Sequence, residues 1–254
     1  MQVELDIAGW AAWAPGLENE EAWANAIQRR DVVSSGGPNS DVGLRPNVSH
    51  LPMKLRRRLS GLGRMAMHVA YDTEHLDRVR VVFCSRHGDL AQTLGLLGNL
   101  AASELLSPTA FSLSVHNGLA GLLSIATKNR QPHTAIAAGE DSFCAGLVEA
   151  AALSQSDCGQ PVLLIYCDEP RPLLYGAAGR DPVIPIALAL LLSPIQESSG
   201  SLILQYGAPD LSFSPNHIDG AAITFLRFFL GQVAHWRWQG MRSSWRCDRV
   251  GAKN

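Results

Sequence analysis

Short apolar runs alternate with helical stretches over the first two thirds of the chain, and this alternation limits the fold most strongly. The runs lie at residues 2–9, 79–84, 133–138 and 162–167, and the stretches between them carry apolar residues at helical spacing. Strands separated by helices pack into a sheet that helices cover on both faces. The pattern therefore predicts an α/β fold with a mostly buried mixed sheet flanked by helices.

Helices are expected between these strands. They are predicted at about residues 18–28, 53–71, 89–106, 117–127 and 141–153. Beyond residue 170, two further apolar runs predict strands at 185–192 and 201–206.

The C-terminal region is predicted to form one long helix. Ser214 and Pro215 make a good N-cap and first-turn pair, and Gly240 can end the helix. The basic tail at 241–254 is then expected to fray or to contact a partner.

Composition excludes several classes of protein. The chain has 254 residues, of which 46% are hydrophobic and 17% charged, and its net charge is -2. It therefore has no positive field that could hold nucleic acid or an anionic membrane. The most apolar run, at 185–192, has about 8 residues where a membrane span needs roughly 20. Because the first residues also lack the basic segment of a signal peptide, we expect a cytoplasmic protein without nucleic-acid or membrane partners.

The cysteines and histidines do not indicate a metal or redox centre. The five cysteines are scattered and none forms a Cys-x-x-Cys pair, so free thiols are expected. No pair of cysteines or histidines has the spacing of a zinc site. The sequence therefore predicts no metal and no cofactor.

The segment at residues 107–149 holds a series of residues in a defined order. They are Ser107-Pro108, Asn117, Ala120-Gly121, Ile125, Pro132, the strand at 133–138 and a turn at Gly139. In this order the segment resembles the β-ketoacyl synthase family of the thiolase superfamily, and a broader resemblance extends over residues 1–207. It implies a thiolase-like fold in which residues 1–207 form one synthase N-terminal half. Residues 208–254 would then be a C-terminal helix and basic tail packed on that domain or on a partner.

In that family a nucleophilic cysteine stands where the strand at 133–138 turns into the next helix. The matching residue here is Glu140, a carboxylate that suits a helix N-terminus but attacks a thioester poorly. Cys144 lies one turn further on and is expected to be a small buried side chain. The histidines, or histidine and asparagine, of the second synthase half have no match after Pro170. The resemblance therefore implies no catalytic residue and no activity of this chain by itself.

A synthase-like subunit without the cysteine resembles a chain length factor, and the short form is similar to the factor of bacterial aryl polyene systems. Such a subunit forms a heterodimer with a catalytic β-ketoacyl synthase, meets an acyl carrier protein through the complex and shapes the acyl tunnel. The resemblance implies tunnel or interface positions at Ala110, Phe111, Leu113, Val115, Asn117, His133, Ala135, Ala137 and Glu140. Ordinary core packing also fits each of these residues, and Glu140 could equally cap its helix.

One predicted helix has a basic face. It carries Lys54, Arg56, Arg57, Arg58 and Arg64. This face could contact an acidic carrier protein, or it could be an ordinary solvated face.

The sequence is also compatible with two other functions. One is a small acyl-thioester-processing enzyme that uses Ser142 or Cys144, although no Gly-x-Ser-x-Gly elbow surrounds either residue. The other is a stand-alone scaffold that binds acyl groups. Labelling of the isolated chain with an acyl-thioester mimic would test the enzyme, and size analysis with and without a ketosynthase would separate the scaffold from a subunit.

Overall fold

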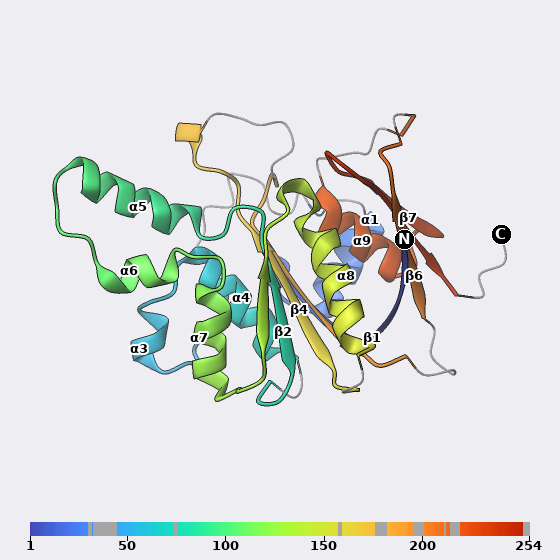
Figure 1. Ribbon diagram of the computed structural model, residues 1–254, viewed down its shortest axis with the longest axis horizontal. Helices are drawn as coiled ribbons and strands as arrows, with labels where there is room; N and C mark the ends of the chain where they lie inside the picture. Colours follow the sequence, from blue (N-terminus) through green and yellow to red (C-terminus); the bar gives the residue numbers. More distant parts are fainter. Residues whose placement is uncertain are drawn as a thin grey trace.

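An eight-stranded sheet with helices against both faces organises the part of the chain that the computed structural model describes (Figure 1). That part consists of residues 1–29, 32, 45–73, 76–156, 159–175, 182–195, 201–210, 212–213 and 219–250. The strands are β1 (Gln2–Trp13), β2 (Arg80–Cys84), β3 (His133–Ile136), β4 (Val162–Asp168), β5 (Ile186–Ser193), β6 (Leu202–Gly207), β7 (His235–Gln239) and β8 (Ser244–Arg249). They lie in the order β3-β2-β4-β5-β1-β6-β8-β7, so β3 and β7 form the edges of the sheet.

The sheet is mixed, as predicted. β2 runs parallel to β3 and to β4, and every other pair of neighbours is antiparallel. β1 is long enough to pair twice, with β6 through residues 2–5 and with β5 through residues 6–13. Among the described residues, β3 has a strand neighbour on one side only, so its outer edge presents backbone groups that no strand pairs.

Five helices were predicted before residue 170, and helices lie at those positions, but one prediction is divided in two and α6 was not predicted. They are α1 (Glu20–Arg29), α3 (Met53–Arg56), α4 (Gly61–Tyr71), α5 (Leu90–Ala101), α6 (Pro108–Leu113), α7 (Gly118–Thr127), α8 (Ser142–Ser154) and α9 (Gly220–Phe229). The helix predicted at 53–71 is split into α3 and α4, because the Ser60 hydroxyl accepts a hydrogen bond from Gly63 N at 3.0 Å and caps α4. In the described part of the chain, no helix has the length and apolar character of a membrane span.

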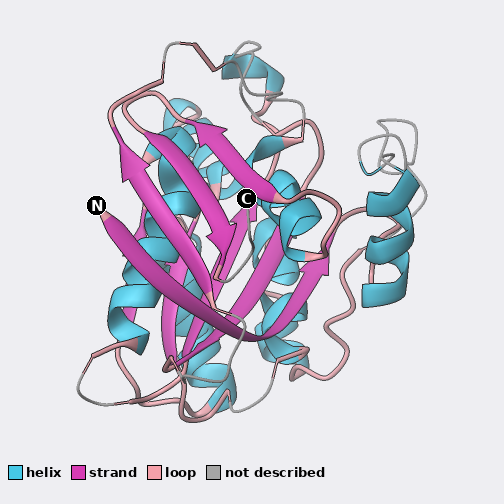
Figure 2. Ribbon diagram, turned by 90° about the vertical axis from the view of Figure 1, so that its right-hand side faces the viewer, coloured by secondary structure: helices cyan, strands magenta, loops and turns pink. Residues whose placement is uncertain are grey.

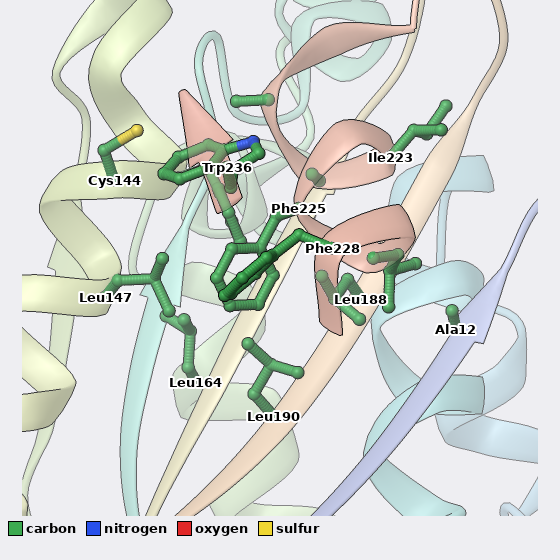
Figure 3. Packing of buried hydrophobic residues seen from close by; sticks show 14 of the residues in the cluster. Ala12, Cys144, Leu147, Leu164, Leu188, Leu190, Ile223, Phe225, Phe228 and Trp236 are labelled. Carbon is green, nitrogen blue, oxygen red and sulfur yellow. The ribbon is translucent and has the colours of Figure 1, made fainter. Parts of the chain in front are cut away.

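Each face of the sheet has its own hydrophobic cluster. On one face α1, α8 and α9 pack against the strands, and the rings of Phe143 and Phe225 meet edge to face with centroids 5.3 Å apart. In Figure 3, Phe225 and Phe228 of α9 lie between Leu147 of α8 and Leu190 of β5. On the other face α4 and α7 pack against the sheet. Figure 2 shows the strands crossing the centre of the molecule with helices to either side.

Helices α5 and α6 form an arm, residues 90–113, that stands away from the sheet (Figure 1). No residue of α5 is buried, although the helix is rich in leucine. Leu100 is 61% exposed, Leu105 97% and Phe111 63%. Glu104 is the one Asp, Glu, Lys or Arg between residues 90 and 127. The arm thus presents an apolar surface that the described part of the chain leaves uncovered.

The C-terminal region does not form the predicted long helix and frayed tail. Helix α9 ends at Phe229, and the predicted start at Ser214 and Pro215 lies outside the described residues. The chain then returns as the hairpin β7–β8, which extends the sheet beside β6. Along β7 the side chains of Trp236 and Trp238 are buried while their neighbours at 235 and 237 are exposed, which is the period of a strand. The division of the chain after residue 207 stays a prediction.

Candidate functional site

Strand β3 leads into α8 through a tight turn, the elbow (Gly139–Asp141). Gly139 has a φ of 61°, a left-handed conformation that glycine adopts without strain. Ser142 closes the turn, because its Oγ accepts a hydrogen bond from Ala138 N at 2.9 Å and donates one to Gly139 O at 2.7 Å. The elbow thereby sets Glu140 and Asp141 immediately before α8.

The carboxylate of Glu140 is turned into the protein. Its side chain is 7% exposed, and Oε1 lies 3.6 Å from Nη2 of Arg86, whose side chain is 14% exposed. Arg86 follows β2, so this ion pair joins the ends of two neighbouring strands. A carboxylate that a guanidinium engages in this way is poorly placed to attack an incoming thioester.

A second buried carboxylate, Asp168 at the end of β4, holds the loop that carries Arg86. Asp168 Oδ1 accepts hydrogen bonds from Ser85 Oγ at 3.0 Å and from Arg86 N at 2.9 Å. Ser85 Oγ in turn accepts one from Gly88 N at 2.8 Å. Sequence reasoning missed Arg86 and Asp168, although both lie at the carboxyl ends of parallel strands, where polar functional groups collect in α/β folds.

The turn between β7 and β8 lies over the elbow. Trp245 Nε1 donates a hydrogen bond to Asp141 Oδ1 at 2.8 Å, and these residues are 104 apart in the chain. The backbone of Arg242 acts on the Asp141 carboxylate as well and lowers its pKa. Gly240 provides the space, because a methyl group on its Cα would overlap Asp141 Oδ1. Burial raises the pKa of Asp141, while the bond from Trp245 opposes that rise.

An open pocket of about 520 Å³, the elbow pocket, lies between the elbow and the β7–β8 turn. It is lined by Ala137, Ala138, Gly139, Glu140, Asp141, Ala145, Met241, Arg242, Ser243 and Trp245. The structure thus brings together two residues of the predicted set, Ala137 and Glu140. Sequence reasoning missed the contribution of the hairpin. The one local signal is the alternation of Trp236 and Trp238 with polar residues, which is too short to distinguish a strand from a helix end.

Ser142 and Cys144, the nucleophiles considered for an acyl-thioester-processing enzyme, both lie inside α8. Cys144 is 0% exposed, and burial raises the pKa of its thiol well above the ordinary value. Ser142 is 1% exposed, and its hydroxyl both accepts a hydrogen bond from the backbone at Ala138 and donates one to the backbone at Gly139. Neither side chain offers a reactive group to solvent.

The predicted residues of the central segment lie along α6 and the turn that follows it. Ala110 is half-buried, Leu113 is buried, and Phe111 and Val115 are exposed. Asn117 is exposed and precedes α7. None of these five belongs to the elbow pocket, and their predicted roles stay predictions.

The predicted residues of β3 occupy the edge of the sheet. His133 is exposed at the start of the strand, and Ala135 is half-buried opposite Phe83 of β2. Their free strand edge leads to Ala137 and the elbow. A role in pairing with another chain stays a prediction.

The predicted basic face is distributed over α3, the following turn and the start of α4. Lys54, Arg57 and Arg58 are exposed, while Arg56 and Arg64 are half-buried. Arg64 Nη2 donates a hydrogen bond to the Arg56 carbonyl at 3.1 Å. The two half-buried arginines therefore support the local fold, and three basic side chains remain at the surface.

Metal ligands are not gathered in the described part of the chain. There, no group of three or more His, Cys, Asp or Glu side chains could hold a metal ion. Cys84, Cys144, Cys167 and Cys247 are free and buried, and Cys158 lies outside the described residues.

Two acids at the end of β4, the buried Asp168 and the half-buried Glu169, predict that stability falls as the pH rises. Burial raises the pKa of Asp168 to about 6 and that of Glu169 to about 7, with the charge of Asp89 adding to the rise at Glu169. Their ordinary values are 3.8 and 4.5, so the folded chain binds more protons than the unfolded chain between about pH 4 and about pH 7. The stability that these groups contribute is present at the acid end of this window and is lost toward its upper end. The loss is on the order of 3 kcal/mol for each group.

Thermal unfolding followed between about pH 4.5 and about pH 7.5 checks this expectation. The variant Glu169→Gln should show a smaller decrease in Tm across the window than the wild type. Glu104→Gln, at an exposed position on the arm, is the matched control and should keep the wild-type slope. An identical slope in Glu169→Gln and the wild type would show that Glu169 does not titrate in this way.

The mixed sheet between two helical layers and the strand–elbow–helix unit define the class: a thiolase-like fold that corresponds to one half of a ketosynthase. A family model described as the N-terminal domain of β-ketoacyl synthase matches residues 23–247. The chain therefore belongs to the β-ketoacyl synthase family.

A solved structure extends this result. The chain is similar to a chain in the complex of the ketosynthase ApeO with its chain length factor ApeC from Xenorhabdus doucetiae. The two are 30% identical with a TM-score of 0.78, and the match covers 97% of this chain and 100% of the other. The predicted resemblance to a synthase-like protein of the aryl polyene type is confirmed.

More distant structures share the fold. The ishigamide ketosynthase/chain length factor is 15% identical with a TM-score of 0.62, and the match covers 82% of this chain and 68% of the other. A β-ketoacyl synthase from Burkholderia phymatum is 12% identical with a TM-score of 0.61, over 92% of this chain and 71% of the other. A comparison with curated proteins found no match.

Proposed function

We propose that this chain is a non-catalytic chain length factor that pairs with a catalytic β-ketoacyl synthase in polyketide or fatty acid biosynthesis, of the aryl polyene kind. The elbow carries the proposal. The position that the family resemblance assigns to the nucleophile holds Glu140, whose carboxylate is buried against Arg86. Condensation then takes place in the partner, and this subunit shapes the tunnel for the growing chain. The likeness to one member of a ketosynthase–chain length factor complex supports this role.

Two surfaces suit pairing with a synthase. The outer edge of β3 can accept a further strand, and a partner that pairs there satisfies its backbone groups. The α5–α6 arm adds exposed leucines and Phe111 in a region almost free of charge, which is the composition of an interface core. A synthase that covered both would remove an open strand edge and an apolar arm from water.

The exposed basic residues Lys54, Arg57 and Arg58 are the surface that we assign to the carrier protein. Acyl carrier proteins are acidic, so complementary charge would steer their approach to the complex.

Size analysis tests the pairing directly. We expect the chain to co-purify as a complex with the catalytic β-ketoacyl synthase of an aryl polyene system, and to make no product by itself. Elution apart from the synthase, or product from the isolated chain, would contradict the proposal.

Ala110→Phe is expected to shorten the products of the reconstituted pair. Ala110 matches a position that a bulky gate fills in related synthases, and its small half-buried side chain leaves room for a longer chain. A phenyl ring there would obstruct that room. The measurement is the chain-length distribution of products from synthase, carrier protein and this subunit. Ala152→Phe, at an exposed position of α8, is the control, and unchanged lengths from an intact Ala110→Phe complex would rule out the gate.

A further inference from the structure

We propose that a hollow over strands β6, β8 and β7 binds the phosphate group of a small phosphate ester. This hollow, the hairpin hollow, has a volume of about 270 Å³, and its lining includes Gln205, Gly207, Asp210, Phe213, Arg237 and Arg246. It is distinct from the elbow pocket, although Trp245 lines both. The inference goes beyond the proposed function, because binding in this hollow requires no synthase.

The register of the strands places the polar part of the lining on one face of the sheet. Gln205 of β6 lies opposite Arg246 of β8, and Arg246 lies opposite Arg237 of β7. Side chains at directly opposed positions point to the same face, so these three form a row across the strands. Trp236 and Trp238, which alternate with Arg237, are buried in the hydrophobic cluster on the other face. The row therefore points away from the core.

The hollow has its shape because small residues lie beside this row. Gly207 and Ser244 oppose each other at the next position on the same face, and a methyl group on Gly207 would meet open space. The loop after β6 is tied to these strands, because Ser244 Oγ donates a hydrogen bond to Ala208 O at 2.7 Å. Phe213 adds an apolar side chain from the same loop. The volume is just below the range of roughly 300–1,000 Å³ that holds drug-sized ligands, so the hollow suits a smaller molecule.

The two arginines make the hollow a place for an anion. Arg246 donates hydrogen bonds to Asp248 from Nε at 2.6 Å and from Nη2 at 2.9 Å. Arg237 is exposed and forms no hydrogen bond or salt bridge with a described residue. Like charges at directly opposed strand positions repel and destabilise a sheet. An anion between the two guanidinium groups would replace this repulsion by two attractions.

Asp210 is the acid in the lining, and its own loop engages it. Its Oδ1 accepts hydrogen bonds from Ser212 N at 3.0 Å and from Ser212 Oγ at 2.5 Å. These bonds hold the pKa of Asp210 below its ordinary value, and the charge of Arg237 adds to the effect. With one carboxylate against two guanidinium groups, the lining keeps a positive balance.

Phosphate fits this balance better than a carboxylate does. A phosphate monoester carries a charge of about −1.5 to −2 at neutral pH and presents three acceptor oxygens, so it can bridge two guanidinium groups at once. Arginine forks match these oxygens in geometry. A carboxylate has one charge and two oxygens, and a single arginine satisfies it. Phe213 provides an apolar contact for the organic part of an ester.

Isothermal titration calorimetry of the full chain at constant ionic strength tests the chemistry, with phenyl phosphate, inorganic phosphate and acetate as probes. We expect phenyl phosphate to bind most tightly and acetate most weakly. Arg237→Gln should weaken phenyl phosphate binding by roughly tenfold or more, because it removes charge-assisted hydrogen bonds. Arg130→Gln, at an exposed position outside the hollow, is the matched control and should keep the wild-type affinity. Equal affinity for acetate and phenyl phosphate, or wild-type affinity in Arg237→Gln, would overturn the inference.

Gly207→Val tests the location. The valine side chain enters open space on a strand, so the variant should fold with the wild-type Tm and lose phenyl phosphate binding. Backbone amide NMR shifts on titration should change in residues 205–207 and 237–246. Retained affinity in folded Gly207→Val, or shifts confined to other segments, would contradict the site. Pairing with a synthase enters neither test, so the proposed function and the hairpin hollow can fail separately.

Discussion

Gly240→Ala is expected to destabilise the protein by about 3 kcal/mol, which lowers Tm by roughly 6–10 °C in a chain of this size. The added methyl group would occupy the place of the Asp141 carboxylate, so that side chain must rotate away or the hairpin turn and the elbow must move apart. The shift would also break the hydrogen bond that Trp245 donates to Asp141. Differential scanning calorimetry of the two proteins measures the change.

A second substitution separates this clash from a general effect of alanine. Asp141→Ala removes the overlapping carboxylate, so the double variant should recover part of the stability that Gly240→Ala loses. A coupling of about 1–3 kcal/mol between the two positions is expected, as for residues in contact. If Gly240→Ala were as stable as the wild type, the close packing of the Asp141 carboxylate against Gly240 would be wrong.

Arg86→Ala is expected to cost about 3–5 kcal/mol, because it leaves the buried carboxylate of Glu140 without its guanidinium. Removing both charges should cost less than removing one. The double variant Arg86→Met/Glu140→Leu replaces the pair by apolar side chains and is expected to be markedly more stable than Arg86→Ala. Urea unfolding of the single and double variants compares their free energies.

The same residues test the non-catalytic role. Glu140→Ala should keep the turnover of the reconstituted synthase complex wherever the heterodimer still forms. Loss of turnover in a heterodimer of unchanged affinity would assign chemistry to Glu140 and would contradict the proposal. Glu21→Ala, at an exposed position of α1 that has no proposed contact, is the matched control and should leave turnover unchanged.

Local pattern predicted most of the sheet and its helices. The runs at 79–84 and 162–167 appear as β2 and β4, with buried side chains on both faces, because strands in the middle of such a sheet are covered on both sides. The break between α3 and α4 was missed because the helical spacing of the leucines continues across it. Ser60 was the contrary signal, since serine fits a helix interior poorly. The sequence could have predicted that Ser60 caps a new helix, since serine is common at N-cap positions.

The C-terminal error has a clear cause. Residues 218–236 place apolar side chains at spacings that fit a helix, and the two tryptophans at 236 and 238 fit a strand equally well. Five residues of a strand carry too little pattern to decide between the two. The strand is chosen because β8, which forms a hairpin with β7, pairs with β6, about 40 residues earlier in the chain.

The sequence by itself determined the class of fold, the family resemblance and the carboxylate at the turn before α8, because each of these depends on residues close together in the chain. Only the tertiary structure decided what surrounds that carboxylate. Arg86 reaches Glu140 because β2 and β3 are neighbours in the sheet, and Trp245 reaches Asp141 across 104 residues because the hairpin extends the same sheet. Contacts of this kind depend on how the strands are ordered, and no local pattern contains that order.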